Sequence, residues 1–74
     1  MHPVEAQSRF YTEAQQVLAQ AKNEARNTLG EKLLRKGAAM LDSPDFNALP
    51  ERCQRDLSEQ YAEAHLRVTG GLVG

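Results

Sequence analysis

The stretch Asn27-Thr28-Leu29-Gly30 decides whether the N-terminal half of this chain forms one helix or two. Asn and Thr are poor helix formers, and Gly often follows a helix end, so the stretch is a fair termination signal. The apolar pattern nevertheless continues through it to Met40. A packed helix also tolerates one interior Gly at a cost of about 1 kcal/mol relative to Ala. We therefore predict a continuous helix over residues 4–36 or 4–41, with a break at Gly30 as the alternative.

The residues before this stretch favour the continuous helix. Between Val4 and Lys36 there is no Pro and only one Gly, and most positions hold good helix formers such as Ala, Gln, Glu, Leu, Lys and Arg. Apolar residues recur at steps of three and four, which places them in one stripe on a helix. The stripe comprises Tyr11, Ala14, Leu18, Ala21, Ala25, Leu29 and Leu33.

Residues 42–50 form the predicted connection to a second helix. They contain two prolines, and Ser43-Pro44-Asp45 is typical of a helix cap followed by Pro at the first helical position. We expect one short helical turn over residues 44–48, with Phe46 and Leu49 closing the end of the core.

The second long helix is predicted over residues 50–68. Its apolar stripe comprises Cys53, Leu57, Tyr61, Ala64 and Val68. Thr69-Gly70-Gly71 resembles a stop signal, because paired glycines after a periodic run commonly end a helix. Residues 69–74 are then expected to form a flexible tail.

The composition predicts an all-α fold within a single domain. The chain has 74 residues, with ten Ala and nine Leu but only four Val and no Ile or Trp. Sheets favour β-branched and aromatic residues, so a β-rich fold is excluded.

The two helix lengths point to a homodimer. A helix over residues 4–36 would be about 50 Å long, and one over residues 50–68 would be about 27 Å. A helical hairpin would leave the N-terminal half of the long helix uncovered, and pairing into a homodimeric four-helix arrangement would cover it. The predicted dimer or partner interface comprises Phe10, Tyr11, Ala14, Val17, Leu18, Ala21 and Ala25. The alternatives are a compact three-helix monomer broken at Gly30 and a chain that orders only with another partner.

Charge is distributed in blocks although the net charge is −1. Residues 22–36 carry five basic and two acidic side chains, whereas residues 37–64 carry six acidic and two basic ones. We expect the blocks to lie side by side and neutralise each other, with further acid-first pairs four residues apart, such as Glu31 with Arg35 and Glu63 with Arg67. The basic block, residues 22–36, is also the candidate contact surface for a partner. Its basic residues are Lys22, Arg26, Lys32, Arg35 and Lys36.

Residues capable of chemistry are sparse. Cys53 lies on the apolar stripe, where a free cysteine serves as a small core residue, and no His is spaced to activate it. His2, His65 and Cys53 do not have the short spacings of a zinc site. No phosphate-binding glycine motif is present. We therefore predict no catalytic residues, no metal site and no cofactor.

These observations favour a non-enzymatic protein–protein interaction module that acts as an adaptor, inhibitor or regulator of a larger partner. The alternative is a dimeric nucleic-acid-binding accessory protein that uses the basic 22–36 segment. The sequence does not fit the helix-turn-helix motif of sequence-specific DNA-binding proteins. A turn centred on Gly30 or on Gly37 would place charged residues at positions that the motif buries in its core. The single cysteine and the absence of a secretory or membrane-spanning pattern predict a cytoplasmic protein without membrane contact.

Overall fold

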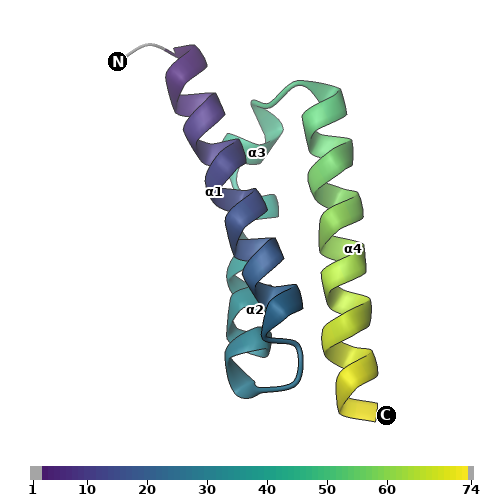
Figure 1. Ribbon diagram of the computed structural model, residues 1–74. Coiled ribbons are helices and arrows are strands. Elements are labelled where there is room, and N and C mark those ends of the chain that lie inside the picture. Colours follow the sequence, from purple (N-terminus) through teal and green to yellow (C-terminus); the bar gives the residue numbers. More distant parts are fainter. Residues whose placement is uncertain (1–2, 74) are drawn as a thin grey trace.

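The computed structural model describes the backbone of residues 3–73 and the side chains of residues 7–70. The described chain is all-α, as predicted (Figure 1). Helices α1 (Pro3–Asn23), α2 (Thr28–Leu41) and α4 (Glu51–Val73) pack into a bundle, with the short α3 (Pro44–Asn47) between α2 and α4. In Figure 1, α1 and α4 run in one direction and α2 returns in the other.

The predicted continuous N-terminal helix is wrong. The helix ends at Asn23, and a new helix begins at Thr28. Asn27 adopts an extended conformation, and its side-chain oxygen accepts hydrogen bonds from the backbone N–H groups of Leu29 and Gly30 at 2.9 and 3.3 Å. This cap satisfies donors that a new helix would otherwise leave unpaired. The alternative of a break is therefore confirmed, although the boundary lies at Asn27 and Gly30 lies inside the first turn of α2.

Gly30 permits the reversal of the chain at this turn. A Cβ atom at this position would overlap the backbone carbonyl of Glu24 and would lie 3.1 Å from the Ala25 Cα. A residue without a side chain is therefore needed where the start of α2 crosses the α1–α2 turn.

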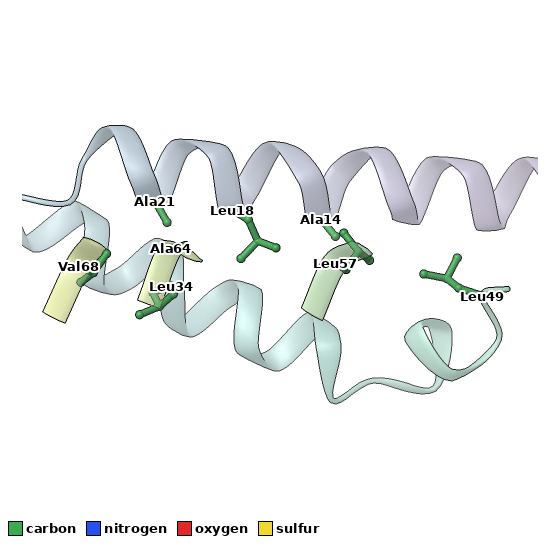
Figure 2. Close-up of a cluster of buried hydrophobic side chains, with 8 residues drawn as sticks. All are labelled: Ala14, Leu18, Ala21, Leu34, Leu49, Leu57, Ala64 and Val68. Carbon is green, nitrogen blue, oxygen red and sulfur yellow. The ribbon is translucent and has the colours of Figure 1, made fainter. Parts of the chain in front are cut away.

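The core lies between α1, α2 and α4, as Figure 2 shows. Its buried residues are Ala14, Leu18, Ala21, Leu34, Leu49, Leu57, Ala64 and Val68. Gly37 lets α2 approach α1 closely, because a Cβ there would lie 2.7 Å from Leu18 Cδ2. Close packing of this kind lets a small domain bury enough apolar surface to fold.

The inward face of α2 differs from the predicted stripe. Gly30, Leu34 and Gly37 are buried, whereas Leu29 is 50% exposed and Leu33 is partly buried. The glycines explain the difference. Gly30 lies against the α1–α2 turn and Gly37 lies against α1, but neither contributes an apolar side chain to a sequence pattern.

The connection closes one end of the core, as predicted. Leu49 is 5% exposed, and Phe46 packs against the core. The Gln7 side-chain amide donates to the Ala48 carbonyl at 3.1 Å, and that of Gln54 donates to the Leu49 carbonyl at 2.8 Å. Two helices therefore hold the backbone that follows α3.

The predicted helix stop at residue 69 is also wrong, because α4 continues to Val73. Val68 is 1% exposed and anchors this part of the helix in the core. Thr69 remains helical with its hydroxyl donating to the His65 carbonyl at 2.7 Å. A glycine lowers helix stability by only about 1 kcal/mol, so an anchored helix can pass through Gly70.

Candidate interaction surfaces

The predicted interface residues, which lie on α1 and in the α1–α2 turn, form part of the core of the single chain. Ala14, Val17, Leu18 and Ala21 are between 0 and 5% exposed. Phe10, Tyr11 and Ala25 are partly buried and pack against the same core. The break at Asn27 explains this, because it allows α2 to fold back along α1. The uncovered stripe on which the homodimer was predicted is therefore absent from the described residues.

Tyr11 connects α1 to α4 through a hydrogen bond. Its hydroxyl donates to Asp56 Oδ2 at 2.5 Å, and the Gln60 side-chain amide donates to the same oxygen at 2.9 Å. The hydrogen bond to Asp56, with burial and the negative charge of that carboxylate, raises the pKa of Tyr11 to about 12. The residue therefore acts as a neutral donor that fixes two helices.

Three residues of the predicted basic surface lie on the outside of α2. We define Lys32, Arg35 and Lys36 as the basic face; all three are exposed, and none forms an ion pair with another described side chain. The half-exposed Leu29 lies on the same helix, three residues before Lys32. The α2 surface therefore combines exposed positive charge with an accessible apolar side chain.

The expected neutralisation between the charge blocks is realised at one position within the described part of the chain. Lys22 Nζ lies 3.6 Å from Glu63 Oε2, which joins α1 to α4. The predicted pairs of Glu31 with Arg35 and of Glu63 with Arg67 do not form in the structure. Glu63 pairs with Lys22 instead.

The other basic residues of the segment contribute to a hollow at the α1–α2 turn. The hollow has a volume of about 390 Å³ and is lined by Lys22, Asn23, Ala25, Arg26, Asn27 and Arg67. We call it the turn hollow. Sequence reasoning missed Arg67, because it belongs to α4 and reaches the turn only through the packing of the bundle.

A second hollow, of about 230 Å³, is mainly apolar. It is lined by Gln7, Ser8, Tyr11, Leu49, Pro50 and Cys53. Cys53 is partly buried and packs against the core. This position suits the small apolar role expected for a free cysteine.

The described residues hold neither a cluster of metal ligands nor a helix that could span a membrane. No three His, Cys, Asp or Glu side chains among them come together as metal ligands. None of the helices, over the length described, has the length and apolar character needed to cross a membrane.

No protein-family model matches this chain, and neither a curated protein nor a solved structure is significantly similar to it. The function of the chain must therefore be inferred from the geometry of its own residues.

Proposed function

We propose that this protein is a non-enzymatic helical interaction module that binds an acidic segment of a partner protein, as an adaptor, inhibitor or regulator. The observation that supports this proposal is the basic face of α2, whose three cations are exposed and form no ion pair with described side chains. Unpaired charges attract an oppositely charged partner and accelerate association.

The spacing on α2 favours a partner that is acidic and partly apolar. Leu29, Lys32 and Lys36 occur at steps of three and four, so they project from neighbouring positions of one helix surface. Leu29 is 50% exposed and provides apolar area beside the two ammonium groups. An amphipathic helix with acidic residues beside its apolar face matches this combination.

Self-association remains a prediction, but the surface available for it is not the apolar stripe of α1. The apolar side chains of α1 fill the core of one chain, so they do not offer the exposed stripe on which the homodimer was predicted. Leu29 and Leu66, which are 50 and 70% exposed, are the large apolar residues left accessible on the described surface. A homodimer would therefore use the outer surfaces of α2 or α4.

The experiment first isolates a binding partner by affinity capture with the wild-type protein. Cross-linking to the purified partner then compares the binding of two charge-reversed variants. Reversal of the basic face in Arg35→Glu/Lys36→Glu is expected to abolish binding. The matched control, Arg52→Glu/Arg55→Glu, changes two exposed arginines on α4 and should retain it. Equal binding by both variants would refute the role of the basic face.

A titration with duplex DNA at low salt tests the nucleic-acid alternative. Under the protein-partner proposal, wild-type protein should bind duplex DNA weakly or not at all. Binding that falls steeply with salt and is lost in Arg35→Glu/Lys36→Glu would instead assign the basic face to phosphate backbones.

A further inference from the structure

The geometry points to a binding site for a phosphate-type oxyanion in the turn hollow. Its positive groups come from three separate segments: Lys22 from the last turn of α1, Arg26 from the α1–α2 turn, and Arg67 from α4. No residue lining the hollow is acidic. This site lies at the turn end of the bundle and does not depend on the basic face of α2.

The nearby acidic groups leave positive charge unbalanced. Glu63 lies 3.6 Å from Lys22, and its side chain is 55% exposed. The Glu24 carboxylate accepts a hydrogen bond from the Asn27 side-chain amide at 2.6 Å. Neither Arg26 nor Arg67 forms an ion pair with a side chain that the structure describes. The hollow therefore holds three cations, of which only Lys22 forms an ion pair, and the two guanidinium groups remain available.

The residue types suit a tetrahedral oxyanion. An arginine presents a planar set of N–H donors that can bind two phosphate oxygens at once, and lysine adds a point charge. Two arginines and a lysine that approach from different segments can surround such a group. An oxyanion bound there would join the end of α1, the turn and α4, so it would also stabilise the folded bundle.

Two sources could provide this group: free phosphate, or a phosphorylated side chain on a protein partner. Their shared chemistry is the phosphate oxyanion. The experiment uses the full-length chain and follows the backbone amide resonances in two titrations, one with inorganic phosphate and one with a short phosphoserine peptide. Sodium chloride keeps the ionic strength constant, and the unphosphorylated peptide is the control.

We expect saturable shifts at residues 22–27 and around Arg67. Arg26→Gln/Arg67→Gln should weaken binding about tenfold or more, because two charge-assisted contacts are lost. The matched variant Arg52→Gln/Arg55→Gln should bind like wild type. Glu63→Gln should bind severalfold more tightly, since it releases Lys22 and removes a repelling charge.

The outcomes distinguish the site from general charge attraction. Shifts spread over all exposed cations, or equal binding by the two double variants, would overturn the proposal. All four substituted arginines are exposed. Both double variants should therefore keep the circular dichroism of the wild type. Similar affinities for phosphate and the phosphopeptide would identify free phosphate as sufficient, whereas at least tenfold tighter peptide binding would identify a phosphorylated partner.

Discussion

Gly30 and Gly70 are both helical, but their surroundings give them opposite roles. A Cβ at Gly30 would overlap the Glu24 carbonyl, whereas nothing lies within 4 Å of a Cβ at Gly70. The Glu24 carbonyl belongs to the backbone, so it can give way to a Cβ at Gly30 only if the whole turn moves. A glycine in open space, by contrast, only lowers helix propensity.

We predict opposite effects for the same substitution at these two positions. Gly30→Ala should lower the free energy of unfolding by about 1–3 kcal/mol, as expected for overpacking. Gly70→Ala should raise it by about 0.5–1 kcal/mol, through helix propensity alone. Urea unfolding followed by circular dichroism measures both. Equal effects of the two variants would contradict the close approach at Gly30.

Tyr11 makes stability depend on pH in the alkaline range. Its pKa is raised from 10.0 to about 12, first by the hydrogen bond to Asp56. Between these values the unfolded chain loses the phenolic proton while the folded chain retains it, so stability falls as pH rises. The contribution is complete below pH 10 and is lost as pH rises through about 12.

Tyr11→Phe removes this contribution and should lower the free energy of unfolding by about 1 kcal/mol at neutral pH. The difference between wild type and variant should shrink as pH rises from 10 towards 12. Using the difference cancels the titration of lysines, which both proteins share. A difference that is independent of pH would contradict the hydrogen bond to Asp56.

At the scale of the elements, local signals predicted some boundaries and missed others. The Pro44 turn and the buried positions Leu57, Ala64 and Val68 follow from proline chemistry and helical spacing. The break before α2 does not, because it depends on where the Asn27 side chain points and on the approach of Gly30 to the Glu24 carbonyl. Such contacts form only once the chain has turned back.

The candidate sites were predictable to a different extent. The basic face follows from the sequence, because exposed lysines and arginines are identifiable from their charge and their positions on the helix. The turn hollow does not, since Arg67 reaches it through the tertiary packing of α4. The α1 stripe was identified correctly as apolar. Its role as core rather than interface depended on the break, which the sequence offered only as the alternative to a continuous helix.

The cap at Asn27 stabilises the start of α2. Asn27→Ala should lower the free energy of unfolding by about 1 kcal/mol, because the first N–H groups of α2 lose their acceptor. Asn27→Ser retains a capping oxygen and should lose less. Unfolding in urea measures both variants. A gain in stability for Asn27→Ala would instead indicate that α1 and α2 join into the continuous helix.

At the scale of the whole molecule, Val17 distinguishes an intramolecular core from a dimer seam. Val17 is 5% exposed within one chain. A domain of this size has only a few kcal/mol of stability, and an unpaired buried charge costs several. We therefore expect Val17→Asp to abolish the helical circular dichroism and cooperative unfolding. Leu66→Asp, at a position that is 70% exposed, should change stability by less than about 0.5 kcal/mol.

If Val17 lay at a seam between copies, Val17→Asp would stay helical and only its sedimenting mass would fall, to the 8.2 kDa of one chain. That result, with Leu66→Asp unchanged in mass, would contradict the bundle as an intramolecular core.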